Sequence, residues 1–371
     1  MGILLLILLF AFAIIIHEAG HMVVAKLFGV KVFEFSVGFG WKLFSRKLGD
    51  TEYLLSALPL GGYVKMKGME RLAPIANPTV EDVLAYQKLA NDNPEVVLHD
   101  CTDKDAFVNK RPWQRFLILV GGVSANLVCA FLFFLIANLS GYEVSTSRIT
   151  PIDKLPAIEA GLKSGDRIIQ INSYNVSDLL DVQKAIRDTK GKPLKVVVER
   201  DGRKLTFTVA PKLVEGNWFI GVKSYGETRK ERLGVVDSVR LAGLSTVVLP
   251  ARFAYGLYLT FTGKVKAKDL AGPVGIVHIG SLVYSKRSMY DFLSFCGMLM
   301  AALFFFNILP IPPLDGGYVL YLAIEKVRGK PVSLRWKNNI TLLFLTLLII
   351  LSIYVCGNDI HRACSGFHLP S

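Results

Sequence analysis

The chain is short of acidic residues and of cysteine, and both shortages exclude kinds of protein. It has 30 Asp and Glu against 43 Lys and Arg, and five cysteines in 371 residues. No Cys-x-x-Cys pair occurs, which excludes a zinc finger or zinc ribbon, and the cysteines do not make a disulfide framework. Cys356 and Cys364 lie close together near the C-terminus, where a disulfide in an oxidising compartment and two free thiols are equally open alternatives.

The Lys and Arg residues lack the clustering that nucleic-acid binding requires. The formal net charge is +13, yet there is no basic arm and no Lys/Arg run interleaved with aromatic residues. We therefore expect no nucleic-acid partner. The chain is 52% hydrophobic with a mean hydropathy of +0.42, which is too apolar for an ordinary soluble protein. A lipid bilayer is the expected partner, and 20% charged residues leave room for a water-exposed domain.

The N-terminal apolar stretch lacks the features of a cleaved signal peptide. Residues 2–16 carry no charge, no basic segment precedes them, and no small-residue cleavage pattern follows them. We therefore expect this stretch to be retained as the first membrane span.

Four stretches are long and apolar enough to be transmembrane helices, at residues 3–28, 113–139, 292–309 and 340–355. We predict a polytopic α-helical membrane protein with these four transmembrane helices, a membrane-associated β-hairpin sheet and an extracytoplasmic α+β domain. The predicted segments are 1–30 (first span), 31–69 (sheet), 70–112 (polar loop), 113–140 (second span), 142–225 (soluble domain), 226–290 (region following that domain), 291–317 (third span and the motif after it), 318–338 (helix and loop), 339–356 (fourth span) and 357–371 (tail).

The distribution of positive charge predicts which side of the membrane each loop faces. Segment 318–338 carries five Lys and Arg residues against a single acid, Glu325, and short loops with such an excess stay in the cytoplasm. Because spans alternate in direction, segment 70–112 is expected in the cytoplasm too. The soluble domain and both chain termini are expected on the opposite, periplasmic side.

Segment 31–69 shows the alternation of apolar and polar residues that is typical of strands, with Gly and Pro between them. The strand-like stretches lie at 32–37, 52–55 and 58–66, and we expect their sheet to enter the membrane or to lie on its surface. Segment 70–112 is polar and weakly patterned, which indicates a flexible insertion with one short helix near 81–90.

Segment 142–225 is polar enough to be a soluble domain. Residues 194–209 predict two strands joined by an Asp201–Gly202 turn, and residues 182–188 predict a short helix.

The next segment, 226–290, contains an apolar stretch that differs from the four spans. Residues 241–261 are interrupted by Gly243, Pro250 and Gly256. We therefore expect an interfacial or re-entrant helix here and not a fifth span.

His17, Glu18 and His21 form a His-Glu-Ala-Gly-His motif inside the first apolar stretch. On a helix the two histidines lie one turn apart on one face, where they can bind one zinc ion with Glu18 beside them as general base. The alternative is that the three residues serve helix packing. An ionisable group at bilayer depth costs roughly 2.5 kcal/mol or more, so three polar residues there favour a metal site.

A catalytic zinc site needs a third protein ligand and an open coordination position. Asp315 is the best candidate, because it follows a span that Pro310 ends and precedes two glycines that allow close backbone approach. The alternative is that Asp315 caps the next helix, expected to begin near Tyr318. Capping alone does not account for Asn307, a polar residue inside the span.

Four motifs together make the chain resemble the site-2 proteases, a family of intramembrane zinc metalloproteases (peptidase family M50). They are His17-Glu-Ala-Gly-His21, Gly61-Gly62-Tyr63-Val64-Lys65-Met66, Asn307-x-x-Pro310 and Leu314-Asp315-Gly316-Gly317. They occur in the family's order, and the resemblance covers essentially the full chain. It implies that His17, His21 and Asp315 bind Zn²⁺ and that Glu18 activates the attacking water.

The same resemblance implies residues that bind the substrate. An exposed strand edge can hold an unwound peptide by adding it to the sheet. Asn307 with Pro310 would hold or polarise the substrate, Gly61, Gly62 and Tyr63 would lie in the strand that pairs with it, and Asn126 would line the site, in an element where Val123 replaces the family's proline.

Residues 155–172 resemble the core signature of bacterial PDZ domains, with Gly161 and Gly165 at turns and Ile168 and Ile171 in a buried strand. PDZ domains bind chain ends or extended peptides by strand addition. The resemblance therefore implies one PDZ domain over the soluble segment, with a peptide or chain end as its partner, where many relatives carry two.

The resemblance implies an enzyme of the bacterial inner membrane that cuts single-span proteins already trimmed by another protease. Such a substrate would be an anti-sigma factor or a signal-peptide remnant. One alternative is a membrane-anchored zinc protease acting on soluble or misfolded proteins, which predicts a ligand in a Glu-rich soluble helix that the sequence lacks. Another alternative is an inactive PDZ scaffold, which predicts a damaged metal-binding motif. That motif is intact, with His17, Glu18, His21 and Asp315 all present. A transporter would need more polar spans and repeat symmetry.

Overall fold

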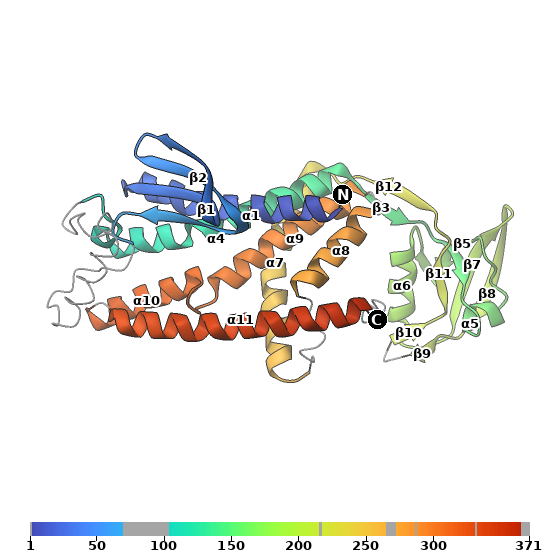
Figure 1. The fold of residues 1–371 in the computed structure, drawn as a ribbon. Coiled ribbons are helices and arrows are strands. Elements are labelled where there is room, and N and C mark those ends of the chain that lie inside the picture. Colours follow the sequence, from blue (N-terminus) through green and yellow to red (C-terminus); the bar gives the residue numbers. More distant parts are fainter. Residues whose placement is uncertain are drawn as a thin grey trace. The chain divides into compact units, whose positions relative to one another are not determined.

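The computed structural model describes residues 2–69, 104–214, 217–264, 272–285, 288–330 and 332–364. Two compact units make up the chain (Figure 1): residues 138–234 form one, and the remainder forms the other. We call them the soluble unit and the helical unit. The short helix expected near residues 81–90 lies outside the described residues.

The four expected spans are all helices of the helical unit, and each is long and apolar enough to cross a membrane. They are α1 (Gly2–Leu27), α4 (Pro112–Ser140), α9 (Met289–Ile308) and α11 (Leu334–Cys364). A 3₁₀ turn, η1 (Phe107–Asn109), precedes α4.

The fourth helix is longer than its apolar stretch, and this corrects the expected tail. Residues 357–364 continue α11, so the helix does not end at residue 356. Positions 356 and 364 therefore lie eight residues apart on one helix, about 12 Å along its axis. That separation is too large for a disulfide between them, which needs Cα atoms within about 7 Å, and Cys356 is a free thiol.

The described part of the helical unit also contains α7 (Val235–Phe261), α8 (Pro273–Ser285) and α10 (Asp315–Arg328). The expected interruptions at Gly243, Pro250 and Gly256 do not break α7, which is one continuous helix that packs against α9. Phe253 in α7 lies 6.0 Å from Phe305 in α9, ring centroid to centroid. The interfacial position of α7 stays a prediction.

Helices α1 and α4 cross through glycine. A Cβ atom on Gly20 would lie 2.4 Å from the Gly121 carbonyl oxygen, and one on Gly121 would lie 2.8 Å from that of Gly20. Small residues let helix backbones approach closely, which is how helices associate in a membrane. The two glycines therefore fix the distance between the two helices.

The expected sheet forms from β1 (Val32–Leu48) and β2 (Thr51–Met66), an antiparallel pair that folds back on itself. Residues 42–48 pair with 51–56 across the turn at Gly49. Residues 32–37 pair with 62–66 on one side. On the other side, residues 34–37 pair with 52–55, and the residue numbers of the two segments increase in the same direction. Residues 62–66 are therefore an edge of the described sheet, next to α1 (Figure 1).

The soluble unit is built on a six-stranded sheet in the order β11-β4-β5-β7-β8, with β6 paired to β5. These strands are β4 (Arg148–Pro151), β5 (Asp166–Ile171), β6 (Tyr174–Asn175), β7 (Leu194–Arg200), β8 (Arg203–Val209) and β11 (Val222–Ser224). The expected hairpin is confirmed: β7 and β8 pair from Leu194 to Arg200, and Asp201 and Gly202 both have positive φ.

Two short strand pairs and two helices complete this unit. Strand β3 (Tyr142–Ser145) pairs with β12 (Thr228–Glu231), and β9 (Lys212–Val214) pairs with β10 (Asn217–Phe219). The helices are α5 (Pro156–Glu159) and α6 (Leu179–Asp188).

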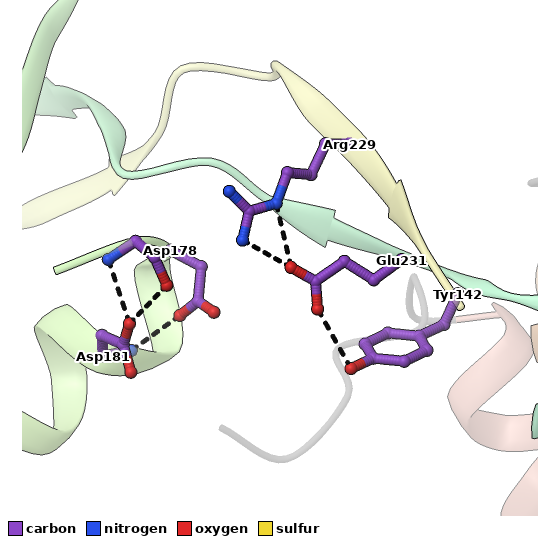
Figure 2. A network of polar contacts seen from close by, with 6 residues as sticks. Tyr142, Asp178, Asp181, Arg229 and Glu231 are labelled. Atoms are coloured by element: carbon purple, nitrogen blue, oxygen red, sulfur yellow. Dashed lines mark hydrogen bonds and ion pairs between the residues drawn. The ribbon is translucent and has the colours of Figure 1, made fainter. Parts of the chain in front are cut away.

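Polar side chains make contacts at the ends of several of these elements (Figure 2). The Tyr142 hydroxyl of β3 donates to Glu231 Oε2 of β12 at 3.2 Å, and Arg229 Nε donates to Oε1 of the same carboxylate at 2.9 Å. At α6, the Asp178 carboxylate accepts from the Asp181 amide at 2.8 Å and so caps the helix. The cap starts the expected helix three residues earlier than its apolar pattern indicated.

Candidate metal centre

The apolar helix α1 holds His17, Glu18 and His21 in its interior turns. One helical turn separates the two histidines, and their ring centroids lie 4.9 Å apart. The Nε2 atoms of the two rings are 3.3 Å apart. Both rings therefore point their Nε2 atoms at one place.

Asp315 reaches this place because the chain folds back tightly between α9 and α10. Helix α9 ends at Ile308, and Asp315 is the first residue of α10. A Cβ on Gly316 would lie 2.1 Å from the Ile308 carbonyl oxygen, and one on Gly317 would lie 2.4 Å from Pro312 N. Only glycine fits at either position. Leu314 is the N-cap residue and no side chain caps the helix, so Asp315 does not serve as the expected cap.

Three potential ligand atoms converge. Asp315 Oδ2 lies 3.0 Å from His17 Nε2 and 3.3 Å from His21 Nε2, and the three residues form a cluster that could hold a metal ion. Zinc binds such nitrogen and oxygen atoms at about 2.0–2.2 Å, which places neighbouring tetrahedral ligands about 3.3 Å apart. The observed separations of 3.0–3.3 Å fit three corners of such a tetrahedron.

The hydrogen bond of His21 sets which ring nitrogen faces the cluster. Its Nδ1 lies 2.8 Å from the Ile118 carbonyl oxygen of α4, which can only accept. Nδ1 therefore carries the proton, and in the neutral ring Nε2 presents a lone pair to Asp315 Oδ2. That oxygen is buried and has no hydrogen-bond partner in the described part of the chain. A lone pair facing a carboxylate oxygen at this distance is repulsive unless a proton or a metal cation lies between them, and the three converging ligand atoms fit a metal ion.

Asn126 supports the other histidine. Its amide nitrogen lies 3.2 Å from His17 Nδ1, and the side chain is fully buried with no hydrogen bond to Oδ1 among the described residues. A half-turn of the amide places Oδ1 against Nδ1–H, the arrangement that leaves Nε2 free to bind metal. Asn126 was expected to bind substrate, but its burial behind His17 places it as a support for that ring.

Gly122 completes this support. A Cβ at this position would lie 2.3 Å from His21 Nε2 and 2.9 Å from the His17 carbonyl oxygen. The absence of a side chain at Gly122 therefore leaves the space that the His21 ring occupies.

The edge strand of the sheet lies against Glu18. A Cβ on Gly62 would lie 3.0 Å from Glu18 Cγ and 3.1 Å from Ile14 Cγ2. The glycine lets the strand backbone come directly beside the glutamate. The structure thus brings the predicted strand and the predicted general base together.

The remaining predicted site residues are Gly61, Tyr63, Asn307 and Pro310, and their surroundings differ. Gly61 has a φ of 150° and packs on the Phe39 ring, where a side chain would collide. Tyr63 stacks on Phe39 and donates its hydroxyl to Glu34 Oε2 at 2.8 Å. Asn307, in the last turn of α9, is half-buried, and exposed Pro310 follows that helix.

With this geometry in place, comparison identifies the class of protein. The model of peptidase family M50 matches residues 5–351, so the chain belongs to this family. It is a zinc metalloprotease of the site-2 protease type. Together with four helices apolar enough to span, this membership indicates a multi-pass membrane protein and implies a metal cofactor.

Named relatives cover nearly the whole chain. "Zinc metalloprotease RasP" of Bacillus licheniformis is 29% identical over 412 residues, with 96% of this chain and 98% of the relative covered. "Regulator of sigma-W protease RasP" of Bacillus subtilis is 28% identical over 413 residues, with 96% and 97% covered. A third relative, from Clostridium acetobutylicum, is 31% identical over 362 residues with 97% of each covered.

The sequence interpretation missed the close approach of Gly20 to Gly121 and the contact of the Ile118 carbonyl with His21. Gly20 was visible inside the His-Glu-Ala-Gly-His motif, and the Gly121–Gly122 pair stood out in an apolar span. Paired small residues on two spans are a signal for a close helix crossing. The Ile118 carbonyl left no signal, because every residue has one.

Proposed function

We propose that this protein hydrolyses a peptide bond inside the membrane segment of a single-span protein. The observation that carries the proposal is the depth of the cluster. His17 and His21 lie within residues 7–27, a helix apolar enough to cross the bilayer. A protease whose ligands sit in a membrane helix meets substrate there.

His17, His21 and Asp315 would hold the zinc, with a fourth position open to water and substrate. When bound, zinc acts as a Lewis acid that polarises a carbonyl and makes water a nucleophile near neutral pH. Glu18 takes the proton of the attacking water on its carboxylate and passes it to the leaving amine. Its position next to His17 on α1, with its Cγ atom against the edge strand at Gly62, supports this role.

The strand edge at residues 62–66 is proposed to hold the substrate. A transmembrane helix hides its peptide bonds, so the cut segment must unwind and find new hydrogen-bond partners away from water. Addition to an open strand edge provides them. Gly62 places that edge beside Glu18, which supports cleavage of the bond that pairs there. Asn307, whose side chain is half-buried at the end of α9, would orient the substrate with Pro310.

The outer part of the sheet is proposed to enter the bilayer. Three apolar side chains of β1 are exposed there: Trp41 is 85% exposed, Leu43 67% and Phe44 62%. Exposed apolar groups gathered on one hairpin mark a membrane or partner contact. The family's membrane setting favours the bilayer.

The soluble unit is proposed to be a PDZ domain that binds a peptide or chain end. Strand β11 ends the order of its sheet and pairs, among the described residues, with β4 alone. Such an edge can accept one more strand. We propose that this unit and both termini lie on the periplasmic side of a bacterial inner membrane, which the charge pattern supports.

The substrate class is proposed to be an anti-sigma factor or a signal-peptide remnant, already trimmed by another protease. One relative is named a regulator of sigma-W protease, which supports the first of these.

The test uses purified enzyme and a trimmed single-span substrate in liposomes. We expect the wild type to cut within the apolar segment, as located by mass spectrometry. Glu18→Gln should bind zinc normally and cut at least about 100-fold more slowly, because general acid–base catalysis contributes that much.

The matched control is Glu159→Gln, the same substitution at an exposed residue of α5. It should cut at the wild-type rate. Cleavage outside the apolar segment, or normal cleavage by Glu18→Gln, would refute the proposal.

A further inference from the structure

Away from the metal centre, three charged side chains join three helices of the helical unit. The Glu325 carboxylate of α10 accepts from Arg115 Nη2 of α4 at 3.1 Å and from Lys337 Nζ of α11 at 2.9 Å. Their side chains are 10%, 19% and 27% exposed for Glu325, Arg115 and Lys337. We call these three residues the charge clamp.

The clamp is ordered by further contacts. The Arg115 guanidinium lies over the Phe107 ring at 5.2 Å, and Lys337 Nζ lies over the Tyr321 ring at 5.6 Å. Burial by itself would raise the pKa of Glu325, but the hydrogen bonds and charges of Lys337 and Arg115 hold that pKa below its usual value. Glu325 is therefore ionised at neutral pH, and the clamp is a set of opposite charges largely shielded from water.

One face of α4 connects the clamp to both histidines. Arg115, Ile118, Gly122 and Asn126 follow each other at intervals of three or four residues, so they lie along one stripe of the helix. The Ile118 carbonyl holds His21, Gly122 makes room for its ring, and Asn126 contacts His17. The helix face that supports two metal ligands thus also carries Arg115.

Helix α10 connects the clamp to the third ligand. Asp315 is its first residue, and Glu325 lies ten residues later, about 15 Å along the axis. Because a regular helix of this length moves nearly as a rigid body, a displacement of α10 at Glu325 also displaces Asp315. Arg115 and Glu325 therefore couple the helix that supports the histidines to the helix that presents the aspartate.

From this geometry, and resting on the proposed zinc site, we infer that Arg115, Glu325 and Lys337 are positioning residues that hold Asp315 in register with His17 and His21. The cluster separations of 3.0–3.3 Å leave little tolerance for a shift of α10 against α4. Since Glu325 lies about 15 Å along α10 from Asp315, it acts on that ligand through the helix and touches neither metal nor substrate.

The test measures zinc affinity of the full-length protein in detergent, by competition with a fluorescent chelator, together with the unfolding temperature of the metal-free form. Glu325→Gln keeps the shape and removes the charge. We expect it to bind zinc about tenfold or more weakly, the usual effect of losing an outer support of a metal site. Glu325→Asp, which keeps the negative charge opposite Arg115 and Lys337, should retain most of that affinity.

The matched control is Glu227→Gln, which removes the carboxylate of an exposed ion pair with Arg148 in the soluble unit; it should leave zinc affinity unchanged. Lys337→Gln keeps the Arg115–Glu325 pair, so it should weaken zinc binding less than Glu325→Gln does. If Glu325→Gln does not fold, Lys337→Gln replaces it in the test. Wild-type zinc affinity in both Glu325→Gln and Lys337→Gln, or an equal loss of affinity in Glu325→Asp and Glu325→Gln, would overturn the inference. The zinc-affinity measurement uses no substrate, so its result can be interpreted even if the proposed cleavage is not observed.

Discussion

The two units differ in the side chains that dominate their interiors. In the soluble unit the largest group of fully buried residues is branched and apolar, among them Ile149, Ile168, Leu194 and Val196. In the helical unit they include small residues, Ala13, Ala25, Ala130 and Ala301, and polar ones, Asn126 and Asp359. Large apolar side chains fill the core of the soluble unit. In the helical unit, small residues let the helices approach each other closely and polar side chains form hydrogen bonds between them.

The difference follows from the solvent that each unit would meet. In water, removing apolar surface is the main stabilising contribution, so large aliphatic side chains fill the core. Between helices in lipid that gain is absent, and small residues and polar contacts hold them together. Adding one methyl group should therefore damage the helical unit most, and removing methyl groups should damage the soluble unit most.

The largest expected effect is that of Gly122→Ala. The new methyl group would lie 2.3 Å from His21 Nε2, so the ring must move by about an ångström, and such a displacement costs roughly 100-fold in activity. Zinc content and cleavage rate measure the effect. Gly243→Ala in α7, whose Cβ would meet nothing within 4 Å, is the control. Full zinc occupancy and activity in Gly122→Ala would contradict the close-approach account.

Next comes Ile168→Ala, in the core of the soluble unit. It should destabilise that unit by about 2–5 kcal/mol, the usual cost of such a cavity, and leave zinc content unchanged. Hydrogen exchange of the full-length protein measures both units at once, and Ile168→Val should cost about 1 kcal/mol. Equal loss of protection in both units would break the comparison.

A smaller loss is expected from Asp359→Ala. Asp359 of α11 is fully buried and accepts from the Gly275 amide of α8 at 2.8 Å. Its removal leaves a buried N–H without this partner, which costs about 1–3 kcal/mol. Thermal unfolding in detergent measures it, with Asp237→Ala, at an exposed position of α7, as control. An equal change in the two variants would show that this polar contact does not matter.

The smallest effect concerns a surface carboxylate of the soluble unit. Hydrogen bonds from the Ser177 hydroxyl and amide lower the pKa of Asp181. A lowered folded-state pKa adds stability above the unfolded value near 3.9 and loses it as the pH falls through the folded value. Asp181→Asn should therefore be slightly destabilising at pH 7 and neutral at pH 2, as measured by urea unfolding of this unit. A penalty that persists at pH 2 would exclude this charge effect.

The metal cluster was predictable because its signals are local. One turn separates His17 from His21, and Asp315 stands at a chain break beside an apolar span. The contacts behind the ligands were not predictable in the same way. Resemblance pointed to Asn126 near the site, but only packing shows that it lies buried behind His17.

Two elements show how long-range contacts override local pattern. Gly and Pro predicted an interrupted helix at residues 241–261, yet α7 continues there because it packs along α9. The apolar run of the fourth span stopped at residue 355, yet α11 continues for two more turns, where Asp359 binds the start of α8. In both cases the helix continues because it contacts residues distant in the sequence.

By itself, the sequence determined the class of chemistry, the four spans, the strands of segment 31–69 and the hairpin at 194–209, because spacing, hydropathy and turn residues act over a few positions. The tertiary structure alone decided the fold-back pairing of residues 32–37, the glycine crossing of α1 with α4, and the clamp from Arg115 to Glu325. These depend on which surfaces meet, and residues 210 positions apart leave no local pattern that reports their contact.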